Sequence, residues 1–324
     1  MLLHDLDWRR FEQPVMSTFT SHEPWCRVSL YSPAVVGTDE GYRMWYCGNR
    51  SGTRTSDMDI GCADSSDGEN WTACKQNPVL TSADLPWDGA WQTPHVLFDG
   101  EAGCFRMWFV MARSERDDRN QLVSFDQQLG HATSRDGIDW EVHPEPIYPS
   151  GRGPCVLRAE RGWQMWMNSM AEPDGDFASL VSSIYRFESP DGLTWTRDPE
   201  PAVTANDALR SVVYPFVVES EGDYTLWYGC HVDGGRFEIY CSTSSDGITW
   251  THHHDAPAFA ASRTPDCFDG RYTSTPCVIE EEDRYLLYYS ARDWGNLYGA
   301  GDGTVQCDSA GIYRHIGLAI AHRP

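Results

Sequence analysis

Short apolar and aromatic segments recur along the whole chain, separated by turns rich in Gly, Pro, Ser, Thr and Asp. Segments of this length that are rich in Val, Ile, Tyr, Phe and Trp are typical of β-strands. One kind of segment opens with Pro-x-Val and occurs at Pro33, Pro94, Pro154, Pro215 and Pro276. The intervals between these prolines are 61, 60, 61 and 61 residues, which predicts five copies of one β-structured unit.

Two further strands are predicted in every unit. An aromatic segment such as "YRMWYCG" follows the Pro-x-Val segment, at Tyr42–Gly48, Phe105–Met111, Trp163–Ser169, Tyr224–Cys230 and Tyr285–Ala291. A third segment begins at Ile60, Leu129, Ile184, Ile239 and Ile316. Three short strands in succession, repeated at a fixed period, predict antiparallel sheets arranged as a repeat protein.

The third strand leads into a turn of sequence S-x-D-G-x-x-W, at Ser65–Trp71, Ser134–Trp140, Ser189–Trp195 and Ser244–Trp250. In such a turn the Asp carboxylate accepts backbone N–H bonds, and the Gly takes a positive φ. Copies on separate units cannot converge on one substrate. We therefore interpret the four aspartates as turn residues, namely Asp67, Asp136, Asp191 and Asp246.

A fifth copy of this turn is missing, because the chain ends at "AIAHRP" after the last third strand. The N-terminal segment His4–Met16 carries Asp7-Trp8 and then a Pro-containing stretch, like the outer strands of the other units. We expect this segment to complete the last unit and close a ring. The prediction is an all-β, single-domain, five-bladed β-propeller with four-stranded antiparallel blades. The predicted blades span residues 27–80, 90–148, 152–203, 210–259 and 271–324, with residues 1–16 as the outer strand of the fifth.

The turn is similar to the Asp box of sialidases, S-x-D-x-G-x-x-W, but is one residue shorter. The longer pattern "YRMWYCG…IGCADSSDGENW" resembles the blades of the five-bladed propeller glycoside hydrolases, the fold of the arabinanase, xylosidase and β-fructosidase families. The resemblance covers almost the whole chain and implies two or three catalytic carboxylates, typically with an Asp just before the proline. The residues at that position are Ser32, Thr93, Gly153, Tyr214 and Thr275. The chain is thus interpreted as a divergent member that lacks the usual pre-proline aspartates.

In a propeller, the connections that lead into the innermost strands and those that join second to third strands lie on one face, around the axis. Residues there that differ between units are the candidates for a site, because the repeat alone does not explain them. The predicted catalytic carboxylates are Glu23, Asp88 and Asp293. A glycosidase needs two carboxylates, about 5–5.5 Å apart for retention or about 6.5–9.5 Å apart for inversion. His95 is a predicted acid/base group, with a ligand of an axial ion or a hydrogen-bonded strand histidine as the alternatives.

Aromatic and cationic side chains in the same connections are predicted to bind substrate. Aromatic faces stack on sugar rings, and guanidinium groups pair with carboxylate or phosphate oxygens. The predicted binding residues are Trp25, Trp91, Gln92, Arg152, Arg210, Arg271, Tyr272, His231 and Arg292. The alternative for the arginines is that they only neutralise nearby carboxylates of an acidic protein.

The formal net charge of −23 argues against nucleic-acid and membrane partners, because such a surface repels phosphate groups. Eleven cysteines without a CxxC pair are interpreted as buried free thiols of a cytoplasmic protein. No signal peptide is recognised in the sequence, although its prior removal is left open. His252–His254 are expected on an exposed outer strand, so no metal site is predicted. No cofactor is predicted either, and a structural cation on the axis is left open.

Three functions are consistent with these residues. The first is a glycosidase-like enzyme that acts on a small sugar-containing or anionic substrate through paired carboxylates. The second is a lyase, cyclase or isomerase of small-molecule biosynthesis that uses His and Arg on the same scaffold. The third is a propeller that binds a ligand without catalysis. The expected partner in each case is a small molecule or sugar, and the oligomeric state is not predicted.

Overall fold

The computed structural model describes residues 6–50, 58–86, 89–116, 122–170, 176–294, 297–299, 305–307 and 313–323. Nearly all regular structure in these ranges is β-strand. The helical elements are single turns, namely η2 (Pro24–Cys26), η3 (Ser82–Asp84) and α1 (Phe177–Leu180). No helix in these ranges is long and apolar enough to cross a membrane.

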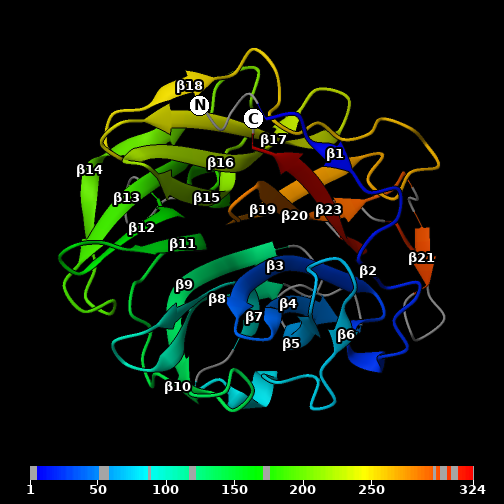
Figure 1. Ribbon diagram of the computed structural model, residues 1–324, viewed down its shortest axis with the longest axis horizontal. Helices are drawn as coiled ribbons and strands as arrows, with labels where there is room; N and C mark the ends of the chain where they lie inside the picture. Colours follow the sequence, from blue (N-terminus) through cyan, green and yellow to red (C-terminus); the bar gives the residue numbers. More distant parts are fainter. Residues whose placement is uncertain are drawn as a thin grey trace.

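Most strands belong to antiparallel groups of four that follow one another in chain order (Figure 1). The first group is β3 (Ser29–Thr38), β4 (Gly41–Asn49), β5 (Met58–Ser65) and β6 (Thr72–Ala73). The second is β7 (Ala90–Asp99), β8 (Cys104–Arg116), β9 (Leu122–Ser134) and β10 (Glu141–Val142). The third is β11 (Arg152–Arg158), β12 (Trp163–Asn168), β13 (Ser183–Ser189) and β14 (Thr196–Thr204). The fourth is β15 (Val213–Ser220), β16 (Asp223–Val232), β17 (Arg236–Ser244) and β18 (Thr251–His253).

The last group joins the two ends of the chain, as the sequence predicts. It contains β19 (Tyr272–Glu280), β20 (Arg284–Arg292) and β23 (His315–His322), together with β1 (Arg9–Arg10) and β2 (Met16–Ser17). Both N-terminal strands pair with β23, and Figure 1 shows the blue β1 beside the red β23. Two further short strands, β21 (Leu297–Gly299) and β22 (Val305–Cys307), pair only with each other in the described part of the chain.

The inner strands β3, β7, β11, β15 and β19 contact one another in this order, and β19 returns to contact β3. This closed ring of inner strands, with antiparallel strands outside it, is the arrangement of a β-propeller. The last two groups form one continuous sheet through the parallel pair Phe237↔Tyr272. The count of five blades therefore stays a prediction, while the all-β propeller arrangement is confirmed.

Each inner strand has a bulge at the residue before its proline. Ser32, Thr93, Tyr214 and Thr275 have positive φ angles of 57°, 44°, 58° and 45°, and Gly153 has 60°. The pairing register shifts at each of these sites, as expected where one extra residue enters a strand. These residues and their prolines surround a small axial cavity of about 30 Å³. The repeated prolines thus mark the axis.

The core lies between neighbouring groups and contains one large aromatic residue from each second strand. These residues are completely buried, namely Trp45, Trp108, Trp166, Trp227 and Tyr288. Burial of rings of this size supplies much of the hydrophobic stabilisation. The aromatic segments found in the sequence are therefore the packing elements between the groups.

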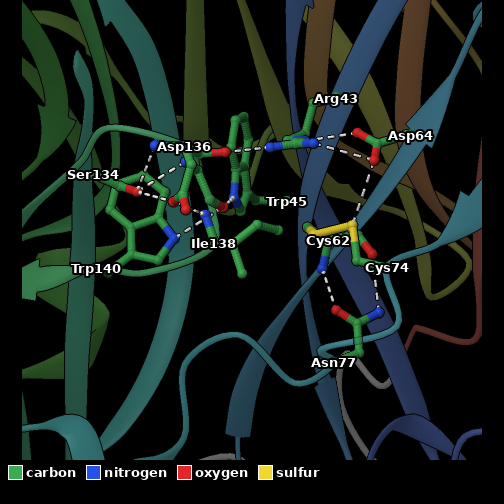
Figure 2. A network of polar contacts seen from close by, with 11 residues as sticks. Arg43, Trp45, Cys62, Asp64, Cys74, Asn77, Ser134, Asp136, Ile138 and Trp140 are labelled. Carbon is green, nitrogen blue, oxygen red and sulfur yellow. Dashed lines mark hydrogen bonds and ion pairs between the residues drawn. A yellow bond between two sulfur atoms is a disulfide. The ribbon is translucent and has the colours of Figure 1, made fainter.

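Each repeated turn joins two strands of its own group and also contacts a neighbouring group. Figure 2 shows the turn Ser134–Trp140. The Asp136 carboxylate accepts bonds from the backbone N–H groups of Ile138 and Asp139, both at 2.9 Å. The Gly137 carbonyl of this turn accepts a bond from Trp45 Nε1 of the preceding group at 2.9 Å. The turn carboxylate thus holds its own loop, as the sequence predicts.

The same link recurs between other groups. Trp108 Nε1 donates to the Gly192 carbonyl at 2.9 Å, and the Tyr288 hydroxyl donates to the Gly68 carbonyl at 2.7 Å. The second of these bonds links the last group to the first. The turns therefore link neighbouring groups at three places around the ring.

One pair of cysteines departs from the prediction of free thiols. Cys62 of β5 and Cys74, just after β6, form a disulfide with a Cα–Cα distance of 5.6 Å (Figure 2). Adjacent antiparallel strands bring these residues within the range of a disulfide. Asn77 brackets the same site, because its side chain accepts a bond from Cys62 N at 2.8 Å and donates to Cys62 O at 2.9 Å. The prediction of free thiols was wrong for this pair.

Candidate functional site

A buried chain of polar side chains links the starts of β7 and β11. Gln127 Nε2 donates to Gln92 Oε1 at 3.1 Å, and Arg152 Nη1 donates to Gln127 Oε1 at 3.1 Å. Arg152 Nη2 also donates to the Tyr214 hydroxyl, and its guanidinium lies 4.7 Å from the centre of the Tyr214 ring. The exposed fractions of Gln92 and Arg152 are only 2 % and 6 %. The structure therefore brings two predicted binding residues into one network.

Aromatic rings continue this network toward β17 and β19. The Tyr214 ring centre lies 6.4 Å from that of Phe237. Phe237 in turn lies 4.4 Å from the His231 ring and 6.0 Å from the Tyr272 ring. Tyr272 begins β19 and His231 lies near the end of β16, so separate strands supply the rings. Two more predicted binding residues, His231 and Tyr272, thus join the same cluster.

Two arginines lie against the Tyr272 ring. The guanidinium of Arg271 is 5.0 Å and that of Arg292 is 5.2 Å from the ring centre. Arg292 is completely buried, whereas Arg271 is partly exposed, donates to the Gly235 carbonyl at 3.1 Å and lies over Trp294. Cation–π contacts of this kind hold guanidinium groups in place at an aromatic surface. We call the set Gln92, Arg152, His231, Arg271, Tyr272 and Arg292 the axial cluster.

The electrostatics of the axial cluster are positive. Although His231 reaches solvent on one side, the protein packed around its ring lowers its pKa to about 4. The positive charges of Arg152, Arg271 and Arg210 lower this pKa further. His231 is therefore neutral at pH 7. The three arginines that lower its pKa are all among the binding residues predicted from the sequence. Arg210 itself is exposed and forms an ion pair with Asp233.

His95 lies deeper on the axis. It contributes to the small axial cavity and to an apolar cavity of about 220 Å³ beyond it. His95 Nε2 is 3.0 Å from the Val156 carbonyl, so this nitrogen carries the proton and donates. Burial lowers the pKa of His95 to about 4. The histidine is therefore neutral and hydrogen-bonded on an inner strand, and its predicted acid/base role stays a prediction.

Three predicted residues lie in packed surroundings at the edges of the first two groups. Glu23 accepts a bond from Trp25 Nε1, and the Trp25 ring stacks on Tyr46 with centres 5.5 Å apart. Trp91 is completely buried, packs on Phe109 and donates to the Thr81 carbonyl at 2.7 Å. Both indoles therefore have protein partners.

Of the two remaining predicted carboxylates, the structure describes Asp293. Asp293 follows the last residue of β20, and its carboxylate lies 3.8 Å from Arg314 Nη1 and 3.6 Å from His315 Nε2. Asp88 lies outside the described residues. The separation of a carboxylate pair therefore stays a prediction. Within the described ranges, no group of three or more His, Cys, Asp or Glu has the geometry to hold a metal ion.

Sequence reasoning missed several members of this region. Tyr214 and Gln127 bind Arg152, and Tyr313 lies between Tyr31 and Tyr272 with ring distances of 5.6 Å and 6.0 Å. Tyr31 and Tyr214 are next to or within the bulges, whose altered register the strand pattern does not reveal. A signal was present at Tyr214, because it is the one aromatic residue among the five pre-proline positions.

Comparison with proteins of known sequence gives a partial match. None of the known protein-family models matches the chain. Two curated proteins of Mycobacterium tuberculosis, "Uncharacterized protein Rv1502" of strain H37Rv and "Uncharacterized protein MT1551" of strain CDC 1551, are each 26% identical over 144 residues. The match covers 44% of this chain and 46% of each relative. The chain therefore matches about half the length of these curated relatives.

Comparison with solved structures supports the fold. One similar structure is described as belonging to "the GH130 family of mannoside phosphorylases", which "contains glycoside hydrolases that target beta-1,2 mannosidic linkages in Candida mannan". Its TM-score is 0.69 at 17% identity, covering 98% of this chain and 96% of that one. A glycosyl hydrolase from Bacteroides ovatus gives 0.69 at 15% identity, covering 97% and 93%. A thermostable family-43 glycoside hydrolase gives 0.63 at 14% identity, covering 90% and 97%. The chain thus has the fold of propeller-type glycoside hydrolases.

Proposed function

We propose that this protein is a glycosidase-like enzyme that acts on a small, anionic, sugar-containing substrate at the axial cluster. The observation that carries the proposal is the convergence of Arg152, Arg271 and Arg292 with the rings of His231 and Tyr272. The partly exposed guanidinium of Arg271 pairs with a carboxylate or phosphate of the substrate, and the buried Arg152 and Arg292 add positive charge behind it. The aromatic faces contact the sugar ring. The fold shared with glycoside hydrolases supports hydrolysis as the reaction class.

The chemistry requires two carboxylates, and our proposal assigns them to Asp88 and Asp293, with Glu23 as the reserve. One carboxyl group protonates the glycosidic oxygen as the bond to the sugar breaks. The other either attacks the sugar carbon or activates a water molecule. Asp293 comes directly after Arg292, whose guanidinium lies over Tyr272, and its carboxylate lies 3.8 Å from Arg314 Nη1 and 3.6 Å from His315 Nε2.

Phosphate is a second acceptor for the same reaction. One structural neighbour is described with mannoside phosphorylases, and a cluster of arginines suits an inorganic phosphate as well as an anionic sugar. In this alternative, phosphate rather than water takes the sugar residue. The two reactions differ in whether turnover depends on added phosphate.

The test is a panel of 4-nitrophenyl glycosides, neutral and carboxylated, measured with and without inorganic phosphate. We expect release of nitrophenol from carboxylated members and a loss of at least about 100-fold in kcat in Asp88→Asn and in Asp293→Asn. Arg161→Gln, on an exposed hairpin outside the axial cluster, is the matched control. Silence across the panel, together with thermal stabilisation by sugar phosphates or uronic acids, would instead favour a lyase, an isomerase or a binding protein at the same cluster.

A further inference from the structure

A second cavity lies away from the axis, where the N-terminal segment crosses the last group of strands. Its volume is about 760 Å³, and it is bounded by residues 10–20, by the segment 266–269 and by Asp293 and His315. Both sides of the wall are tied to the sheet, because β2 pairs with β23 and Arg10 donates to the Ala260 carbonyl. The walls of the cavity are therefore held in place by strand pairing and by a hydrogen bond to the main chain.

The charge of this cavity is opposite to that of the axial cluster. Four carboxylates line it, namely Glu12, Asp266, Asp269 and Asp293. Arg10 is the cation in the lining and lies 3.1 Å from the Asp269 carboxylate. Even when Arg314, 3.8 Å from Asp293, is added, carboxylates outnumber guanidinium groups by four to two. The cavity thus has an unbalanced negative charge.

Two buried polar atoms of the lining make no hydrogen bond to any residue that the structure describes. Asp269 is completely buried, and its Oδ2 binds Arg10 and the Tyr289 hydroxyl, whereas its Oδ1 has no partner there. His315 is 2 % exposed and bonds Ser17 through Nδ1, whereas its Nε2 makes no hydrogen bond there and lies 3.6 Å from Asp293 Oδ2. Buried polar atoms are costly when unbonded, so such a pair in a cavity wall points to a ligand that satisfies them.

Aromatic rings complete the wall around these polar groups. Phe19 and Phe268 both meet the His315 ring edge to face, with ring centres 5.2 Å and 5.8 Å away. Phe19 is 66% exposed, which is unusual for so large an apolar side chain. Aromatic faces beside carboxylates are a favourable environment for an ammonium group, through cation–π attraction and charge pairing together.

The cavity and the axial cluster take residues that are neighbours along the chain. Arg292 lies over Tyr272 of the axial cluster, and the next residue, Asp293, lines the cavity. Tyr313 stacks against Tyr31, and two residues later His315 lines the cavity. The two regions are therefore close along the chain but present different groups to a ligand: guanidinium groups at the axial cluster and carboxylates in the cavity.

We propose that this cavity binds a small ligand that carries a protonated amine. The ammonium group lies among Asp266, Asp269 and Asp293, donates to the open Oδ1 of Asp269, and its carbon skeleton contacts Phe19 and Phe268. The inference shares Asp293 with the proposed function, but Asp266, Asp269, Phe19 and Phe268 have no part in the proposed reaction, so the site is tested through them and stands whether or not Asp293 is catalytic.

Two pairs of probes test this site: cyclohexylamine against cyclohexanol, and glucosamine against glucose, titrated into the full chain with ligand-observed NMR. In each pair the amine should bind at least about tenfold more tightly than the neutral molecule. Asp266→Asn should weaken amine binding about two- to fivefold, and Asp269→Asn at least about fivefold. Asp139→Asn, an exposed carboxylate in a repeated turn, is the charge-matched control and should change nothing.

Equal binding of the amine and its neutral counterpart overturns the proposal, as does unchanged binding in the Asp266→Asn protein. If Asp269→Asn fails to fold, Asp266→Asn decides alone. Arg271→Gln separates this site from the axial cluster: unchanged amine binding supports a second site, whereas tighter binding, the result expected when a nearby positive charge is removed, would place the amine at the axis and refute it.

Discussion

The repeated turns and the starts of the inner strands both recur around the ring, but they differ in what varies. The turns keep Ser, Asp, Gly and Trp in every copy, and each Asp bonds the same two backbone N–H groups of its loop. At the starts of the inner strands the backbone bulge recurs, whereas the side chains around it change from one strand to the next. Repetition therefore marks what holds the propeller together, and variation on a constant backbone marks where a ligand can be recognised.

The charges follow the same division. A turn aspartate satisfies its carboxylate locally, and the backbone N–H groups of the turn lower the pKa of Asp191 and of Asp246 to about 2. The guanidinium groups of the axial cluster instead lie together over aromatic rings. Arg152 and Arg271 of the cluster, together with Arg210 outside it, lower the pKa of His231 beyond the effect of its packing.

The largest expected effect is on the stability of the propeller rather than on ligand binding. Trp45→Ala removes a completely buried indole and its bond to the Gly137 carbonyl. We expect the free energy of unfolding to fall by about 3–5 kcal/mol. Urea denaturation measures this loss, and Trp45→Phe should lose less because it keeps most of the ring packing. If Trp45→Ala left stability unchanged but abolished ligand binding, the division of roles would be wrong.

The second largest effect is expected on the stability of the propeller at acidic pH. Burial lowers the pKa of His95 to about 4, whereas a histidine in the unfolded chain titrates near 6.5. The unfolded chain therefore binds the proton first, so stability is complete above about pH 6.5 and falls as the pH drops toward 4, by a few kcal/mol at most. Unfolding measured between pH 7 and 4 should show this slope, and His95→Gln should reduce it. His131 and His231, whose pKa values burial also lowers, to about 3 and about 4, contribute to the remaining slope. A slope that is unchanged in His95→Gln would assign it to other groups.

A smaller effect is expected on affinity when one axial arginine is removed. Arg271→Gln deletes the partly exposed guanidinium over Tyr272, so the dissociation constant of a carboxylated or phosphorylated sugar should rise about tenfold. Stability should change little, because this side chain reaches solvent. Calorimetric titration measures the change, with Arg161→Gln as the control. A greater loss of affinity in the control would point to a diffuse effect of protein charge.

The smallest effect is expected in a turn. Asp136→Ala removes the acceptor of two backbone bonds and should cost about 1 kcal/mol of stability without changing ligand affinity. Asp139→Ala in the same turn is the matched control, since only its backbone N–H takes part in this cap. Thermal unfolding distinguishes the two variants. Equal losses in both would mean that the carboxylate bonds contribute nothing measurable.

The repeat allowed much of the fold to be predicted, because each strand and turn carries its own local signature. The N-terminal strand was found from the absence of one turn, and Arg9 indeed pairs with Ile320 of β23. The site was harder. Arg152, Arg271 and Tyr272 were identified because they precede or begin inner strands, but their partners Gln127 and Tyr313 come from other strands. Such contacts depend on bulges and on neighbouring groups, which the pattern along one strand does not encode.

For two tryptophans the sequence pattern allowed two interpretations, packing in the core and stacking on a ligand. Trp25 and Trp91 looked like ligand-stacking residues because aromatic side chains serve both purposes. In the fold, Trp25 fills the space above Gly48 and Gly61, where a Cβ atom would lie only 2.5 Å and 2.3 Å from its ring. The glycines that admit this ring are distant in sequence, so their relation to Trp25 follows only from the paired strands.

The most direct test of the central claim compares the preference for anionic over neutral sugars in three proteins. The unaltered chain, Arg271→Gln and Asp136→Ala are each titrated calorimetrically with carboxylated, phosphorylated and neutral sugars of the same ring. The account predicts that the unaltered chain and Asp136→Ala share the same preference for an anion, and that Arg271→Gln loses about tenfold of it. An equal affinity for neutral and anionic sugars in all three proteins would contradict it.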